Sequence, residues 1–209
     1  MFPSSQDFKY YIDIFKSPKY LAIKQNIIDF CIGEKNIFSI HPESLNNIIS
    51  AEIELQEYKN DKTYDFTSIV IKYSKTMEKE IYSFMKELIK FLIKNNKNIE
   101  NIGYAVNGKN FIISDILYNK PNLGTYKYIL KSEIIVNTIK NSFDDYKIGY
   151  FIQKTFPYYI NFLQDIRNEV VHGKIASKAD ATILRNKILG VADDNILTDI
   201  LKYKKKLLN

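Results

Sequence analysis

The segment Phe156–Gly173 has the sequence FPYYINFLQDIRNEVVHG. Its apolar residues recur every three to four positions, as they do in a helix that buries one face. That apolar face consists of Tyr159, Phe162, Leu163, Ile166 and Val170. Asp165, Asn168 and His172 fall on another face. We therefore expect a helix over residues 156–172 that packs on one side and presents polar side chains on the other.

Three residues near the end of this predicted helix have side chains that suit chemistry on a phosphate: Arg167, Asn168 and His172. Asn168 and His172 are four positions apart and therefore share a face. Arg167 lies about 140° around the axis from His172, but its long side chain can reach towards that face. We expect the three groups to be able to converge on one phosphate.

His172 is placed to carry a proton. Gly173 is a typical helix stop, so His172 falls in the last turn, where free carbonyl groups and the macrodipole stabilise an imidazolium. The carboxylates of Asp165 and Glu169 lie within reach and act in the same direction. Our hypothesis is that the pKa of His172 is near or above its ordinary value, so that it exchanges a proton at cellular pH.

The Arg-Asn-x-x-x-His pattern, late on an amphipathic helix and followed by Gly173, resembles the motif of the HEPN superfamily. Members are α-helical domains, and many are metal-independent ribonucleases of toxin-antitoxin, abortive-infection and CRISPR-linked defence systems. Residues 65–80 are similar to the long first core helix of several such families, and residues 122–130 resemble their Leu-Gly segment. The resemblance covers about residues 65–189, and its specific part is the Arg/His motif.

The resemblance implies an endoribonuclease, and the residues agree with metal-independent chemistry. The sequence contains no spacing typical of metal ligands, and the simplest reaction open to this set uses the 2′-hydroxyl of RNA as the nucleophile. Arg167 would stabilise the charged phosphate, Asn168 would orient the phosphate or His172, and His172 would act as acid or base. No metal or cofactor is expected. The supporting residues are Asp165 and Glu169, and the candidates for substrate contacts are Lys174 and Arg185.

Other interpretations of the same residues stay open. The motif is also compatible with a surface ion-pair cluster that includes Asp165 and Glu169, or with a non-catalytic HEPN-like dimeric module that binds RNA or a partner protein. Arg185 is compatible with a salt bridge instead of a substrate contact. Some HEPN toxins carry a tyrosine, modified by a partner enzyme, two residues after the histidine. Lys174 occupies that position here, which disfavours the modification-controlled version.

In-line cleavage is easiest with both an acid and a base, whereas one motif supplies one histidine. The missing partner is either His41, the other histidine of the chain, or His172 of a second chain. The composite site between paired subunits that is known in the family favours a homodimer. RNA is therefore the expected partner, together with a second copy of the chain and an antitoxin or regulatory protein.

Composition predicts the class and compartment. The chain has 209 residues, 45% of them hydrophobic, with only seven Gly and five Pro, which favours a mainly all-α fold. The net charge of +6 suits a nucleic-acid partner, although lysine enrichment is also typical of AT-rich genomes. One cysteine, Cys31, excludes an internal disulfide and a cysteine-rich zinc site. Without a leader or a long apolar run, a cytoplasmic protein with no membrane partner is expected.

Two parts are expected: residues 1–60, an N-terminal helical appendage packed on the same core, and residues 61–209, a HEPN-like helical domain. Ser17-Pro18 predicts a helix start, Gly33 its end, and Pro42 a second start. Asn-Gly predicts a hairpin turn. Further elements are expected over residues 65–94 (a long core helix), 103–113 (a hairpin), 124–140, 177–190 and, from Asp193 or Asp194, to the basic end at 202–206.

Overall fold

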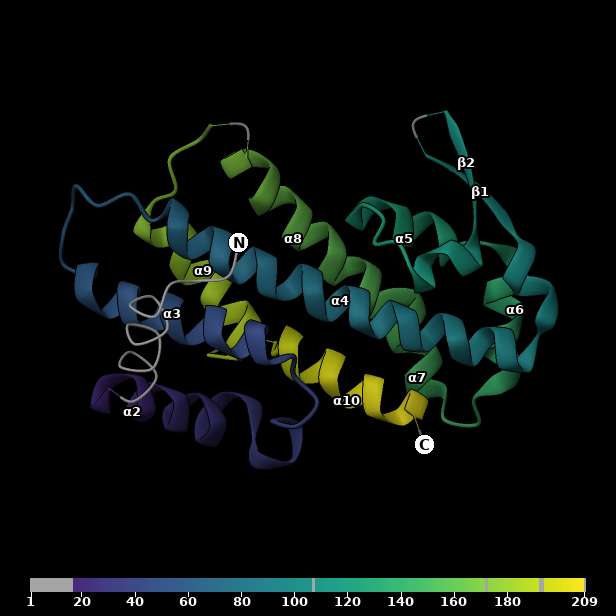
Figure 1. Ribbon diagram of the computed structural model, residues 1–209, viewed down its shortest axis with the longest axis horizontal. Coiled ribbons are helices and arrows are strands. Elements are labelled where there is room, and N and C mark those ends of the chain that lie inside the picture. Colours follow the sequence, from purple (N-terminus) through teal and green to yellow (C-terminus); the bar gives the residue numbers. More distant parts are fainter. Residues whose placement is uncertain (1–16, 107, 172, 192–193, 209) are drawn as a thin grey trace, which may run out of the picture. The chain divides into compact units, whose positions relative to one another are not determined.

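The structure, a computed structural model, describes residues 17–106, 108–171, 173–191 and 194–208. These residues form a mainly α-helical fold with one small antiparallel sheet, which confirms the predicted fold class (Figure 1). The chain divides into two compact units. The first contains residues 17–76 and 175–198, and the second contains residues 77–174 and 199–208, in both cases as far as they are described. Residues 17–60 therefore share a unit with residues 61–76 and 175–198.

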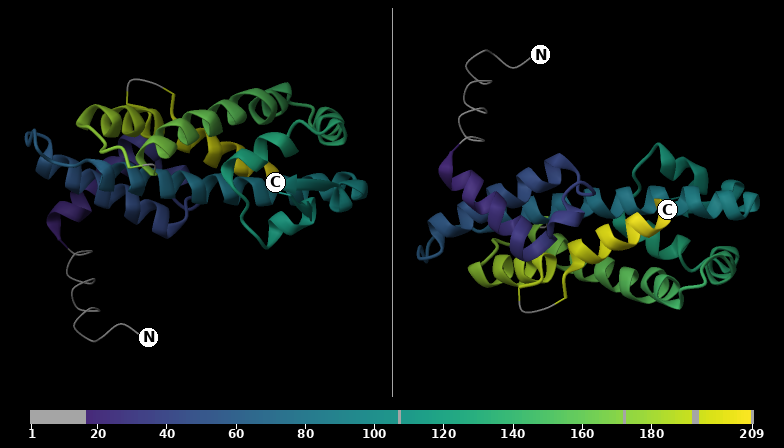
Figure 2. Two further views of the ribbon diagram at one scale, coloured as in Figure 1. Left: turned by 90° about the horizontal axis from the view of Figure 1, so that it is seen from above. Right: turned by 90° about the horizontal axis from the view of Figure 1, so that it is seen from below.

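Helix starts in the first unit are set by single capping residues. The hydroxyl of Ser17 accepts a hydrogen bond from the backbone N of Tyr20 at 3.1 Å. His41 begins the next helix, its Nδ1 accepting from Glu43 N at 3.2 Å. The two helices that follow these caps, α2 and α3, pack along one another (Figures 1 and 2). The bounds in this unit are α2 (Pro18–Ile27), the π-helical turn η1 (Ile28–Ile32), the 3₁₀ turn η2 (Glu34–Asn36), α3 (Pro42–Tyr58) and α9 (Lys178–Leu189).

Helix α4 (Thr67–Asn95) matches the long predicted core helix. Asp65 precedes it and accepts a hydrogen bond from Thr67 N at 2.8 Å. Its apolar stripe is at most 1% exposed and consists of Val70, Tyr73, Met77, Ile81, Phe84, Leu88 and Leu92. Residues 67–76 belong to the first unit and residues 77–95 to the second. The three-to-four spacing therefore identified the core positions of both units.

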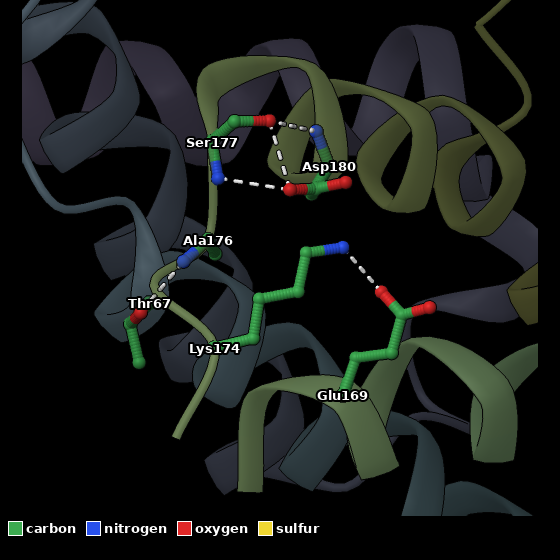
Figure 3. Close-up of polar contacts among 6 residues, drawn as sticks. All are labelled: Thr67, Glu169, Lys174, Ala176, Ser177 and Asp180. Atoms are coloured by element: carbon green, nitrogen blue, oxygen red, sulfur yellow. Dashed lines mark hydrogen bonds and ion pairs between the residues drawn. The ribbon is translucent and has the colours of Figure 1, made fainter. Parts of the chain in front are cut away.

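Helix α9 begins with the predicted capping box (Figure 3). Ser177 Oγ accepts from Asp180 N at 3.2 Å, and Asp180 Oδ2 accepts from Ser177 N at 2.9 Å. The preceding residue, Ala176, donates its N–H to Thr67 Oγ1 at 3.0 Å and accepts from Phe66 N at 3.1 Å. These bonds fix the approach to α9 against the start of α4.

The second unit contains the predicted hairpin, β1 (Gly103–Val106) and β2 (Lys109–Ile112), which projects beyond the neighbouring helix in Figure 1. Tyr104 pairs with Phe111 across the strands, and their rings stack with centroids 5.6 Å apart. Gly108 has φ +74°, a conformation that glycine adopts without strain. Asn107, the other residue of the predicted turn, lies outside the described residues.

Two predicted elements need correction. The helix expected over residues 124–140 is two helices, α5 (Leu123–Ile129) and α6 (Glu133–Ser142). Ser132 occupies the N-cap position of α6 and an acidic residue follows it, a start signal inside an otherwise continuous apolar pattern. Helix α10 (Ile196–Leu208) begins later than Asp193 or Asp194, where Asn195 Oδ1 accepts from Thr198 N at 2.9 Å.

An aromatic cluster fills the core of the second unit. The ring centroids of Phe84 and Phe156 are 4.7 Å apart, and the ring of Phe151 stacks on Tyr203 at 4.0 Å. The remaining elements of this unit are η3 (Lys97–Asn101), η4 (Ile113–Leu117), α7 (Tyr146–Tyr150), the π-helical turn η5 (Phe151–Thr155) and α8 (Phe156–Val171). Helix α8 is the predicted motif helix, within one residue at its end.

Candidate functional site

Helix α8 is anchored along its apolar face and packs against α5 (Figure 1). Phe156, Tyr159, Ile160 and Leu163 are each at most 2% exposed. The hydroxyl of Tyr159 also donates to Asp199 Oδ2 at 2.7 Å. This packing fixes the helix axis and leaves the last turns to present their polar side chains.

Arg167 is held by an acidic residue of α4. Its Nε donates to Glu78 Oε1 at 2.6 Å, and the second oxygen, Oε2, accepts from Lys120 Nζ at 2.8 Å. We call these three residues the Glu78 network. Glu78 is largely covered, with 16% of its side chain exposed, whereas 42% of the Arg167 side chain is exposed. Glu78 therefore holds the guanidinium at Nε, while the exposed part of the side chain faces solvent.

Four further predicted site residues, on α8 or just after it, are described by the structure: Asp165, Asn168, Glu169 and Lys174. Asn168 and Asp165 are exposed. Glu169 forms an ion pair with Lys174, the Nζ–Oε2 distance being 2.5 Å, and its carbonyl accepts from Lys174 N (Figure 3). Lys174, a predicted substrate contact, thus folds back onto the end of α8. His172, the predicted proton carrier, lies outside the described residues.

Arg185 belongs to the first unit and forms a salt bridge, the alternative that its sequence context left open. Its Nε and one terminal nitrogen donate to the two oxygens of Glu52 at 2.6 and 2.8 Å. Glu52 is 6% exposed and also accepts a hydrogen bond from the hydroxyl of buried Tyr73. Burial and the Glu52 charge raise the pKa of Tyr73 well above its ordinary value. Arg185 thus completes a buried network.

Cys31 lies beside this buried network, in the wall of a pocket of about 290 Å³ that Glu52 and Arg185 also line. Burial raises the pKa of the Cys31 thiol, an effect that the positive charge of Arg185 only partly offsets. A raised pKa keeps the group as a thiol, which is the poor nucleophile. Cys31 therefore behaves as a small apolar residue in this wall.

Sequence reasoning missed Glu78, which contacts the predicted residue Arg167, and Lys120, which contacts Glu78. Glu78 lies within the segment that resembles the first core helix, but its position alone does not distinguish it from Glu80 or Glu87. Lys120 is 42 residues from Glu78 in the chain. Charges brought together over such separations leave no local pattern, so only the fold identifies them.

A pocket of about 190 Å³ adjoins the Glu78 network. We call it the hairpin pocket; Lys120 forms part of its wall while donating to Glu78. The other lining residues are Tyr104, Val106, Phe111, Asp115, Asn119, Pro121 and Asn122. It is smaller than the usual site for a drug-sized ligand and suits one flat ring system.

Two of the four lysines at the basic end, residues 202–206, form ion pairs within the second unit. Lys204 is buried and contacts Glu80 Oε2 and Ser83 Oγ, both at 3.3 Å. Lys206 pairs with Asp145 at 2.7 Å. These contacts give Lys204 and Lys206 a structural role within the second unit.

In the part of the chain that the structure describes, no group of three or more His, Cys, Asp or Glu side chains is arranged to hold a metal ion. None of the helices described is both long enough and apolar enough to cross a membrane. Comparisons with protein-family models, curated proteins and solved structures gave no match.

Proposed function

We propose that this protein is a metal-independent endoribonuclease that cleaves RNA through attack of the 2′-hydroxyl, in a bacterial phage-defence or toxin-antitoxin role. The observation that supports it best is the placement of Arg167. Its side chain is 42% exposed, yet its Nε is held by Glu78, whose side chain is only 16% exposed.

In the proposed reaction the 2′-oxygen attacks the adjacent phosphorus, and the bond from phosphorus to the 5′-oxygen breaks. One general base removes the 2′-hydroxyl proton and one general acid protonates the leaving 5′-oxygen. The products are a 2′,3′-cyclic phosphate and a 5′-hydroxyl end. Arg167 stabilises the charge that develops on the phosphate oxygens, Asn168 orients the phosphate or the histidine, and His172 transfers a proton.

A second candidate is a non-catalytic dimeric module that binds RNA or a partner protein. The observation that favours it is that Glu78 already partners both Arg167 and Lys120, which neutralises part of their charge. The two functions differ in the effect of His172→Ala. This change abolishes cutting and leaves binding nearly intact in an enzyme, and changes little in a binding module.

The test is cleavage of end-labelled RNA in excess chelator by the wild type, Arg167→Ala and His172→Ala. Cutting by the wild type alone, with 2′,3′-cyclic phosphate ends, is expected. Lys127→Ala, which loses an exposed hydrogen bond between Lys127 Nζ and Asn161 Oδ1, is a control for removal of a surface cation. No cutting of several RNAs by folded wild-type protein, or equal cutting by all variants, would contradict the proposal.

A further inference from the structure

The hairpin pocket combines three chemical features. Tyr104 and Phe111 present stacked rings on one wall, and Phe111 is 36% exposed. Asn119 and Asn122 contribute amides, and Asp115 contributes a carboxylate. Lys120 adds one positive charge. A nucleotide has the matching parts, namely a flat π face, an edge of donors and acceptors, and an anionic phosphate.

The polar groups of the pocket are only partly used by the protein itself. Asn122 stands at the N-cap of α5, yet its side chain makes no capping hydrogen bond there. Asp115 uses one carboxylate oxygen, Oδ2, which accepts from Ile112 N at 3.0 Å. An asparagine amide can pair with a base edge, and a carboxylate can accept from the exocyclic amino group of a base. These groups can therefore discriminate between bases.

The helix that follows the pocket residue Asn122, α5, carries a buried hydroxyl that has no hydrogen-bond partner among the described residues. Tyr126 is fully buried, and its hydroxyl makes no hydrogen bond with any residue in the described part of the chain. Burial raises the pKa of Tyr126, and the nearby groups of Tyr82, Tyr104 and Glu78 raise it further. The unpaired hydroxyl belongs to α5, whose N-cap residue, Asn122, lines the pocket. Buried donors without a partner are uncommon and call for an explanation.

The position of the pocket relative to Arg167 is set by one carboxylate. Lys120 and Arg167 contact the two oxygens of Glu78, so only the width of that group and two hydrogen bonds separate their nitrogens. A base in the hairpin pocket would leave its own phosphate beside these two cations. We propose that the hairpin pocket binds one unpaired base of single-stranded RNA, next to the phosphate held by Arg167, and selects the base at the cleavage position.

This inference rests on the proposed ribonuclease function, and binding can be tested apart from cleavage. Isothermal titration calorimetry would measure Kd for the four ribonucleoside 5′-monophosphates with wild type, Phe111→Ala, Asn122→Ala and Tyr118→Ala. Tyr118 is a nearby aromatic residue that is 82% exposed and does not line the pocket, which makes it the matched control. Circular dichroism confirms that each variant is folded. Asn122→Ala keeps the test valid if Phe111→Ala disturbs the hairpin.

Wild type should prefer one base. Phe111→Ala loses one stacking partner, which should raise Kd by about tenfold. Asn122→Ala should reduce the difference in Kd between the four bases. Tyr118→Ala should bind as wild type does. No binding of any nucleotide by the wild type, or equal weakening in Tyr118→Ala, overturns the inference.

Cleavage of a random RNA pool separates the two proposals. An unchanged base preference beside the cut in active Phe111→Ala and Asn122→Ala overturns the pocket assignment and leaves the ribonuclease standing. Nucleotide binding with the expected variant pattern, but without any cutting by the wild type, supports the pocket and contradicts the ribonuclease.

Discussion

Glu78 is the single residue whose replacement best tests how Arg167 works. Glu78→Gln keeps the shape of the side chain and removes the charge that orients both Arg167 and Lys120. If Glu78 positions Arg167 for phosphate, we expect the cleavage rate to fall by about 10–100-fold, because small displacements of a positioned group are costly. Single-turnover cleavage of a labelled RNA measures this effect.

Whether the cleavage rate of Glu78→Gln falls or rises distinguishes two roles of Glu78. A rise in rate for Glu78→Gln would mean that Glu78 masks Arg167, and would contradict positioning. Glu87→Gln is a matched control, since Glu87 lies on the same helix and pairs with Lys90, three positions away, at 2.8 Å. It should retain the wild-type rate.

Arg185 matters for stability because it partners a carboxylate that is almost fully buried. Arg185→Ala leaves Glu52 charged and partly unsatisfied beside Tyr73. Removing one member of a buried pair typically costs about 3–5 kcal/mol, so we expect the free energy of unfolding to fall by that amount. Urea denaturation followed by circular dichroism measures it.

The control for Arg185 is an exposed pair in the same unit. Lys19 and Glu57 are 2.7 Å apart with about half of each side chain in solvent. Lys19→Ala should change the free energy of unfolding by less than about 1 kcal/mol. A loss in Arg185→Ala as small as this would show that the Glu52 network does not support the fold.

Helices α3 and α4 are joined in the first unit by a cluster around Glu54. Its carboxylate accepts hydrogen bonds from Tyr64 Oη at 2.5 Å, Ser68 Oγ at 3.1 Å and Lys72 Nζ. Burial favours the neutral form of Glu54, but the hydrogen bonds from Lys72 and Tyr64 outweigh it and lower the pKa below its ordinary value of 4.5. These elements are therefore held together by a charge that acid removes.

The lowered pKa of Glu54 predicts how the free energy of unfolding depends on pH. A carboxylate with a lowered pKa in the folded state adds stability that is complete above its unfolded pKa and lost as the pH falls through the folded value. We expect the free energy of unfolding to decline below about pH 4.5 more steeply in wild type than in Glu54→Gln. Denaturant titrations between pH 6 and about pH 3 measure the slopes. Identical slopes would contradict a role for Glu54, and Glu57→Gln serves as the control on the same helix.

For the whole molecule, we expect a homodimer whose cleavage site includes both chains. Each chain carries one motif and therefore one predicted proton carrier, His172, and the other histidine, His41, caps α3 through its Nδ1. A second copy of His172 would provide the missing acid or base. Multi-angle light scattering under dilute native conditions should give twice the 24.5 kDa of one chain. A single-chain mass with full cleavage activity would contradict the composite site.

Local sequence patterns predicted helix starts well where a capping side chain precedes the helix. Ser17 with Pro18, Asp65, and Ser177 with Asp180 mark helix starts because their side chains bond to nearby backbone N–H groups. The hairpin was likewise predictable. The break between α5 and α6 was not, because the apolar pattern continues across both helices and Ser132, at the N-cap position of α6, makes no capping hydrogen bond with its side chain.

The sequence by itself determined the helical class, the position of the motif helix and the core stripe of α4, since each depends on the spacing of neighbouring residues. Only the tertiary structure placed Arg167 against Glu78, joined Lys120 to the same carboxylate and paired Arg185 with Glu52. Such pairs join residues up to 133 positions apart. Their geometry depends on how helices pack, and packing is a property of the folded chain that no local spacing encodes.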